Sequence, residues 1–229
     1  MCGRYGTTMT MREAARRLGI DAGKLLAGET RAIYNAAPGT AQLTAIGQVD
    51  DPADLELTRT CWGFLPSWQT NPSKSPINMR IESSTKRYWN KAFLKRRCVV
   101  PANWWYEWRR EDGAKQPYAI RPVGDGGFFF AGVWSVAKSL PADHALHGVR
   151  TFAIATKPAS VDLASIHTRM PIALDDATAQ RWLEQGARGH EELSGILAST
   201  ELQRYESWPV SSRVNRPEND DPALLDALG

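Results

Sequence analysis

Residues 96–137 read RRCVVPANWWYEWRREDGAKQPYAIRPVGDGGFFFAGVWSVA, and this stretch decides the fold. Runs rich in valine, isoleucine and aromatic residues alternate in it with EDGAKQP and GDGG. Residues of the first kind favour the half-buried surface of a β-strand, whereas glycine, aspartate and proline favour turns. The stretch therefore predicts consecutive strands joined by short connections.

Further strands and helices are expected on either side of this stretch. Alternating apolar and polar residues predict strands at 40–49, 55–64, 150–156 and 207–212. Helical spacing of apolar residues predicts helices at 7–19, 83–96, 176–185 and 192–199. Residues 34–40 and the proline-rich residues 65–78 read as irregular segments.

Strands thus dominate the middle of the chain, and helices flank them. The sequence shows no internal repeat and no linker that would divide it. We therefore expect a single α+β domain over residues 1–229, built on a curved, barrel-like sheet of mixed or antiparallel strands fringed by helices.

The composition indicates a packed globular protein. Hydrophobic residues make up 42% of the chain, no apolar run approaches the roughly 20 residues that span a bilayer, and the first residues lack the apolar centre of a signal peptide. The three cysteines, Cys2, Cys61 and Cys98, are odd in number and far apart, which is typical of reduced thiols. We expect a cytoplasmic protein without a membrane-embedded part.

The net charge of +3 is unevenly distributed along the chain. Residues 1–115 hold 18 lysines and arginines against 11 acidic residues, whereas residues 116–229 hold 10 against 14. The densest basic stretch, residues 86–98, carries six cations beside aromatic side chains. A solvated helix face has this composition, and so does a surface that binds a polyanion with stackable bases.

Cys2 directly follows the initiator methionine. Removal of Met1 would leave the Cys2 α-amine (pKa about 8) and thiol (pKa about 8.5) both partly nucleophilic near neutral pH. An aldehyde would form an imine with such an amine, and the thiol could then close a five-membered ring. No internal cysteine can do this, although a small buried or frayed terminal residue is the simpler reading.

Glu107 lies among tryptophans and a tyrosine in WWYEW. Strand alternation places Trp105 and Glu107 on one face, and Trp104, Tyr106 and Trp108 on the other. A carboxyl beside bulky aromatic rings would be partly desolvated, which raises its pKa toward the range of a general acid or base. A glutamate on an edge strand that points to solvent is the alternative.

Two further polar residues stand out. His167 in IHTRMP precedes Arg169 by two residues, as an acid or base beside an anion site would. Asn78 in NMRIES precedes Arg80 by the same spacing. A packing histidine and an asparagine that only satisfies the loop backbone are the plainer readings.

Metal and cofactor sites are not expected. The cysteines have no partners at ligand spacing, and His144 and His147 lie in PADHALHG, which reads as a surface loop. GDGG joins two strands and opens no helix, so it does not match a phosphate-binding loop.

Eight short motifs together resemble one family in their order and spacing. They are MCGRY, YNAAPG, WGFLPSW, NMRIES, RRCVVPANWWYEW, QPYAI, IHTRMP and WPVSSRVN. They resemble the SOS response-associated peptidase family, whose members are abasic-site sensors that cross-link to DNA. The resemblance covers nearly the whole chain.

The resemblance implies a role for each of the four candidate residues. Cys2, exposed by removal of Met1, would attack the ring-opened aldehyde of an abasic deoxyribose in single-stranded DNA and end as a thiazolidine. Asn78 would hold the sugar and the cysteine, Glu107 would shuttle protons during imine formation, and His167 would assist ring opening and reversal. The expected partner is single-stranded DNA with abasic sites, and the expected place is the cytoplasm or the nucleoid. Neither a cofactor nor a metal is implied, and a monomer would suffice.

The resemblance also implies residues that contact the flanking DNA. The cations that would grip phosphates are Arg4, Arg80 and Arg169, and each lies two residues from a candidate catalytic residue. The apolar loop that would stack on bases contains Leu65, Pro66 and Trp68. One departure from the family pattern is the pair Trp104–Trp105, where the family has glycine and phenylalanine, and we expect it to narrow the space beside Glu107.

The sequence is also compatible with two other functions. An N-terminal cysteine with asparagine, glutamate and histidine could act as a cysteine-dependent peptidase or N-terminal-nucleophile amidohydrolase, with removal of Met1 as an autocatalytic step. Alternatively, the chain could be a plain single-strand-binding or scaffold module in which Cys2 is incidental.

Overall fold

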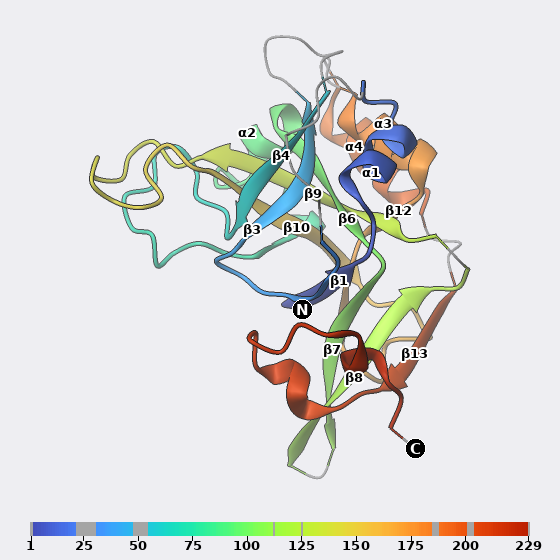
Figure 1. Cartoon of the computed structure of the whole chain (residues 1–229). Coiled ribbons are helices and arrows are strands. Elements are labelled where there is room, and N and C mark those ends of the chain that lie inside the picture. Colours follow the sequence, from blue (N-terminus) through green and yellow to red (C-terminus); the bar gives the residue numbers. More distant parts are fainter. Residues whose placement is uncertain are drawn as a thin grey trace.

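A computed structural model of the chain describes residues 2–21, 31–47, 55–111, 113–124, 126–184, 188–200 and 204–228. These residues form two β-sheets, which lie one above the other in the view of Figure 1, with most of the helices beside the upper one. Within the described ranges, no helix combines the length and the apolar character needed to cross a lipid bilayer.

The larger sheet curls into a ring. Its strand order is β11-β10-β4-β3-β6-β9-β12, and β10 also pairs with β9, which closes the ring, and with β5. The pairs β10–β4 and β10–β5 are parallel and the others are antiparallel. Its strands are β3 (Ala41–Gly47), β4 (Leu55–Trp62), β5 (Asn78–Arg80), β6 (Arg97–Ala102), β9 (Phe128–Val136), β10 (Arg150–Pro158), β11 (Arg169–Pro171) and β12 (Ala173–Leu174). This confirms the expected α+β fold with a barrel-like mixed sheet.

The second sheet, over the described residues, has five antiparallel strands in the order β13-β8-β7-β1-β2. Its strands are β1 (Arg4–Thr7), β2 (Ile33–Ala36), β7 (Trp104–Glu111), β8 (Ala114–Pro122) and β13 (Tyr205–Pro209). Strands β6 and β7 are separated by Asn103 alone, so the chain passes directly from the ring into this sheet. Residues 34–36 were expected to be irregular, but they pair with β1.

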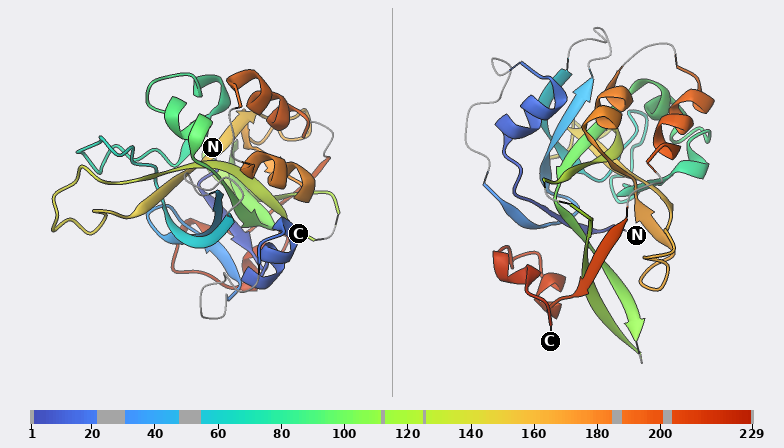
Figure 2. Two further views of the ribbon diagram at one scale, coloured as in Figure 1. Left: turned by 90° about the horizontal axis from the view of Figure 1, so that it is seen from above. Right: turned by 90° about the vertical axis from the view of Figure 1, so that its right-hand side faces the viewer.

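Four α-helices of the described part of the chain lie against the ring (Figures 1 and 2). They are α1 (Met11–Leu18), α2 (Asn90–Lys95), α3 (Asp176–Leu183) and α4 (His190–Ala198). Each contributes buried side chains to one hydrophobic cluster with the ring strands, among them Ala14, Phe93, Ala179 and Leu193. Thr10 caps α1: its hydroxyl accepts a 3.1 Å hydrogen bond from the Glu13 N–H.

The second helix is shorter than expected. A helix was predicted over residues 83–96, but only Asn90–Lys95 is α-helical, and the 3-10 turn η2 (Ile81–Ser83) and further turns precede it. Tyr88 and Trp89 pack against the ring of Phe64, with centroids 5.9 and 4.9 Å away. These contacts hold the segment against the curled β-sheet. This tertiary packing outweighs the helical pattern of the segment's sequence.

The C-terminal segment covers the outer face of the five-stranded sheet (Figure 2). Its described residues include the 3-10 turns η3 (Ser212–Asn215) and η4 (Pro222–Leu225). The buried Asn35 amide donates hydrogen bonds to the carbonyls of Val214, Arg216 and Asn219, at 3.2, 3.0 and 2.9 Å. One asparagine thereby ties β2 to the end of the chain.

Candidate active site

Cys2 lies two residues before β1, in a buried cluster between the two sheets. Its side chain is 0% exposed and packs in the same cluster as Tyr5 and Trp105. Its carbonyl oxygen accepts a 2.9 Å hydrogen bond from Nδ2 of Asn78, the first residue of β5. The Asn78 side chain therefore hydrogen-bonds to the backbone, as the simpler interpretation of the sequence suggested. The backbone group that it binds belongs to the candidate nucleophile, Cys2.

Glu107 is brought beside this segment by the pairing of β1 with β7. Arg4 pairs with Tyr106, so Glu107 lies opposite the residues that precede β1. The carboxyl is 2% exposed, and burial raises its pKa to about 7. Burial also raises the pKa of the Cys2 thiol well above its usual value, and the charge of Glu107 raises it further. The site thus pairs a carboxyl that titrates near neutral pH with a thiol that stays protonated there.

Replacement of Glu107 by glutamine is expected to make stability less dependent on pH. A raised pKa means that the folded chain loses stability as pH rises from 4.5 to about 7, because the buried carboxyl must become charged. At about 1.4 kcal/mol per pKa unit, the loss is about 3 kcal/mol. Urea unfolding at pH 5 and pH 8 should show that the free energy of unfolding of the wild type falls by about this amount between the two pH values, relative to that of Glu107→Gln. An equal change in both proteins would contradict the prediction.

His167 lies in the connection from β10 to β11. Leu163 and Ile166 of this connection belong to the buried cluster that contains Cys2. Nδ1 of His167 lies 2.9 Å from the backbone nitrogen of Arg169 and 3.1 Å from its carbonyl oxygen, so it accepts from the first or donates to the second according to the tautomer of the ring. Burial lowers the pKa of His167, so the ring is neutral at neutral pH.

Arg169 is held by a carboxylate. Its two terminal nitrogens donate to the two oxygens of Glu82, at 2.6 and 2.9 Å, and Nη2 also donates to the Thr156 carbonyl at 2.7 Å. In β10, Thr156 pairs with Arg80 of β5 on one side and with β11 on the other. Arg80 thus pairs with Thr156, and the Arg169 side chain, from a position opposite Pro158, reaches back to the carbonyl of that same threonine.

Arg4 and Arg80, the two other expected phosphate cations, differ from each other. Arg80 is exposed. The guanidinium of Arg4 donates to the carbonyls of Gly3 and Asn215, at 3.1 and 3.4 Å, and burial lowers its pKa. Of these two, Arg80 presents its charge to solvent, whereas Arg4 links β1 to the C-terminal segment.

The apolar loop exposes one of its three candidate residues. Trp68 is 53% exposed and meets Tyr88 edge to face at 5.7 Å. Leu65 is fully buried beside Ala137, and Pro66 is buried as well. The loop therefore presents the Trp68 ring to solvent, whereas Leu65 and Pro66 are covered.

The tryptophan pair that departs from the family pattern is divided between two faces. Trp105 belongs to the cluster of Cys2, whereas Trp104 lies in the cluster under the C-terminal segment, 5.6 Å from the ring of Tyr34. A Cβ on Gly6 would lie 2.2 Å from the Trp104 ring, so the indole occupies space that a glycine in β1 leaves open. Trp104 therefore lies away from Glu107 and does not narrow the space beside it.

Sequence reasoning missed Glu82 and Thr156. Glu82 lies in the NMRIES motif, but its partner Arg169 lies 87 positions further along the chain. A local sequence pattern does not predict a contact over such a distance. His144 and His147 lie in the connection between β9 and β10, as expected. Among the described residues, no cluster of three or more histidine, cysteine or acidic side chains could hold a metal ion.

A family model described as SOS response associated peptidase (SRAP) matches residues 1–217. The chain belongs to the SRAP family. This confirms the resemblance carried by the eight motifs, and it places Cys2, Asn78, Glu107 and His167 inside the matched range.

Several relatives of this SRAP chain have names that state a role. The abasic site processing protein YoqW of Bacillus subtilis is 31% identical over 99% of this chain and 100% of its own length. The abasic site processing protein YedK of Escherichia coli is 31% identical over 98% of this chain and 99% of its own. The abasic site processing protein HMCES of Xenopus tropicalis is 28% identical, over 78% of this chain and 59% of its own.

Solved structures share the SRAP fold seen here. A phage-related protein of Bordetella bronchiseptica superposes with a TM-score of 0.70 at 28% identity, over 92% of this chain and 95% of its own. A protein of Bacteroides thetaiotaomicron reaches a TM-score of 0.78 at 19% identity, over 99% of this chain and 100% of its own, which is a likeness of fold.

Proposed function

We propose that this chain processes abasic sites in single-stranded DNA by linking to them covalently through Cys2 once Met1 has been removed. The observation that carries the proposal is the 2.9 Å hydrogen bond from Asn78 to the Cys2 carbonyl, beside a buried Glu107 whose pKa is raised to about 7. The names of YoqW, YedK and HMCES support the substrate class.

The chemistry needs no co-reactant. The Cys2 α-amine adds to the C1′ aldehyde of the ring-opened sugar, and loss of one water leaves an imine with a C1′–N double bond. The thiol then adds across that bond: sulfur joins C1′, and the thiol proton passes to the imine nitrogen. A five-membered thiazolidine results, with two new bonds at C1′ and one water released.

The raised pKa of the thiol favours this order of steps. A buried thiol that stays protonated is a poor nucleophile, whereas a neutral amine attacks an aldehyde directly. Glu107, which titrates near neutral pH, would protonate the departing hydroxyl and then take up a proton. Asn78 would hold the Cys2 backbone, and the neutral His167 ring would donate a proton to the sugar oxygen during ring opening.

The surroundings suit a single strand of any sequence. Arg80 and Arg169 would bind phosphates on either side of the reacting sugar, with Arg4 positioning the N-terminal segment. Stacking on the exposed Trp68 would contribute about 1–3 kcal/mol per base without sequence preference. Abasic sites arise in any sequence, so such tolerance fits a damage sensor.

Intact-mass spectrometry tests the proposal. After incubation with an abasic single-stranded oligonucleotide, the expected mass is that of the chain without Met1 plus the oligonucleotide minus one water. The same lesion in a full duplex should give less product, because paired bases cannot stack on Trp68. A noncovalent complex alone, dissociated by high salt, would refute the covalent proposal and favour a plain binding module.

The family description also names a peptidase, which makes proteolysis the second candidate. The same cluster could cleave the Met1–Cys2 bond if the thiol attacked the Met1 carbonyl, the Cys2 nitrogen took up a proton and left as the α-amine, and water then hydrolysed the thioester to release methionine. Protein made in cells depleted of methionine aminopeptidase separates the two. Loss of Met1 in such cells would favour autoproteolysis, whereas retention of Met1 would assign its removal to the host enzyme.

A further inference from the structure

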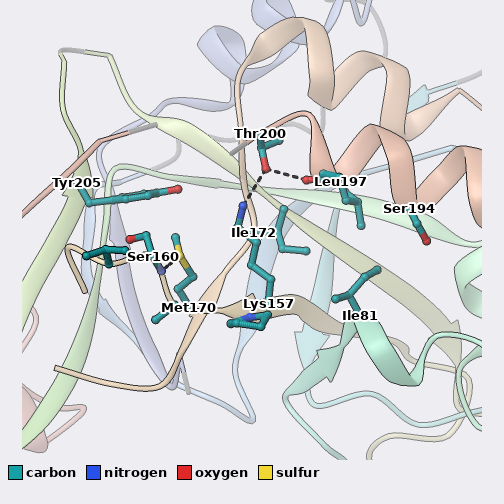
Figure 3. A pocket seen from close by; sticks show the side chains of 13 residues that line it. Ile81, Lys157, Ser160, Met170, Ile172, Ser194, Leu197, Thr200 and Tyr205 are labelled. Carbon is teal, nitrogen blue, oxygen red and sulfur yellow. Dashed lines mark hydrogen bonds between the residues drawn. The ribbon is translucent and has the colours of Figure 1, made fainter. Parts of the chain in front are cut away.

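A cavity of about 520 Å³ lies between the end of β10, strand β11 and helix α4. Figure 3 shows Tyr205, Ser160 and Met170 at one end of it, and Ile81, Ser194 and Leu197 at the other. Cavities of roughly 300–1,000 Å³ are typical of sites for small organic groups. Neither the proposed chemistry nor the proposed phosphate contacts use this cavity.

The walls of the cavity suit a flat aromatic ring with polar edges. Ile172 and Leu197 supply apolar surface, and Val161, which is 94% exposed, lies at the mouth. The Lys157 ammonium donates to the Thr200 hydroxyl at 3.4 Å, so a positive charge and a hydroxyl lie side by side in the wall (Figure 3). Apolar surface with a few polar groups is the usual lining of a ligand site.

The cavity adjoins the residues that would hold the DNA backbone. Ile81 follows Arg80 directly, and Met170 follows Arg169, so both side chains in the lining are neighbours of the expected phosphate cations. Ile81 is three positions after Asn78, which is at most about 10 Å along an extended chain. A strand bound at Arg80 and Arg169 would therefore pass the mouth of the cavity.

We propose that this cavity binds the nucleobase of a nucleotide next to the abasic site. The proposal rests on the proposed function, because it needs the DNA strand to lie across Arg80 and Arg169. In it, the base enters past Val161, lies against Ile172 and Tyr205, and places a polar edge near Lys157 and Thr200.

Charge favours a nucleotide over an apolar peptide in this place. The cations Arg80 and Lys157 lie beside the cavity and in its wall, the charge of Arg169 is paired with that of Glu82, and of the described residues that line the cavity none is acidic. A nucleotide brings a phosphate with its base, and these cations attract it, whereas an apolar peptide gains nothing from their charge. Few directional groups line the cavity, so it would accept any of the four bases.

The test uses oligonucleotides that cannot cross-link. A tetrahydrofuran residue replaces the abasic sugar and has no aldehyde, so fluorescence anisotropy reports binding alone. A second tetrahydrofuran replaces the nucleotide on either the 5′ or the 3′ side and removes its base. We expect one of these losses to weaken wild-type binding about tenfold, which corresponds to about 1.4 kcal/mol.

Ala198→Trp would fill the mouth of the cavity. Ala198 is exposed on α4 and lines the cavity, so an indole there obstructs it without entering the core. This variant should bind the oligonucleotides with and without the neighbouring base equally. Ala223→Trp is the matched control, because Ala223 is exposed in η4 and is not part of the lining, and it should keep the tenfold difference.

A fluorescent base reports on the same cavity. 2-Aminopurine at the sensitive position should change its emission on binding to wild type and Ala223→Trp, but not on binding to Ala198→Trp. Equal wild-type affinities for all three oligonucleotides would overturn the cavity proposal and leave the cross-linking chemistry standing. Conversely, a base dependence without any covalent product from an aldehyde-bearing oligonucleotide would support the cavity and refute the proposed function.

Discussion

Replacement of Cys2 by alanine is expected to lower the yield of heat-stable adduct with abasic single-stranded DNA by at least about a hundredfold, because loss of a nucleophile removes a whole reaction step. Once Met1 is removed, the Cys2→Ala chain still offers an α-amine, so an imine can form but cannot be closed by sulfur. Denaturing gels after heating should therefore show no adduct, whereas borohydride, which reduces imines, should trap one.

Two controls make this result specific. Cys61→Ala removes another buried thiol, in β4, and should cross-link like the wild type. Cys2→Ser keeps the geometry and the amine but replaces the sulfur nucleophile, so it should resemble alanine after heating. An undiminished yield of heat-stable adduct from Cys2→Ala would contradict the proposed thiazolidine linkage.

Local alternation predicted much of the site region. The segment WWYEW was expected to divide its side chains between two faces, and the structure confirms it: Trp105 packs with Cys2, whereas Trp104 and Tyr106 pack under the C-terminal segment. The exposed edge-strand alternative for Glu107 is wrong, because β7 has a partner strand on each side. The division of WWYEW between two faces could be predicted because the alternation of side chains along a strand depends on neighbouring residues only.

The closure of the ring could not be predicted in this way. Strand β10 pairs with β9 in antiparallel fashion and with β4 and β5 in parallel fashion. The contacts that bring Asn78 to Cys2 span 76 positions. Such pairings depend on which strand edges meet in three dimensions, and the alternation within each strand is the same for every arrangement.

The basic stretch at residues 86–98 shows the same limit for a single residue. Its cations were interpreted together, as a solvated face or a surface for a polyanion. Arg97 belongs to neither kind of surface, because it is 0% exposed. Burial lowers the pKa of its guanidinium to about 10. Charge patterns count residues, but only the fold decides which of them face solvent.

Arg97 instead joins helix α3 to the ring. From β6, Nε donates to the Trp182 carbonyl at 2.7 Å and Nη1 to the Leu94 carbonyl at 2.6 Å, and Nη2 donates to the Glu184 carbonyl. Trp182 and Glu184 stand at the end of α3, where carbonyls lack partners within the helix. One planar side chain therefore satisfies acceptors from two helices at once.

Arg97→Met is expected to destabilise the protein by about 4 kcal/mol, because it leaves three carbonyls without their donor at about 1–3 kcal/mol each. For a chain of this length that lowers the melting temperature by about 10 °C, measurable by calorimetry. Arg97→Lys should recover part of the loss, since an ammonium reaches fewer of the three carbonyls than a guanidinium. Arg96→Met is the matched control: Arg96 is partly exposed, its Cζ lies 5.8 Å from the Trp134 centroid, and its loss should cost about 1 kcal/mol or less. Equal melting temperatures for Arg96→Met and Arg97→Met would mean that the buried guanidinium does not hold α3 to the ring.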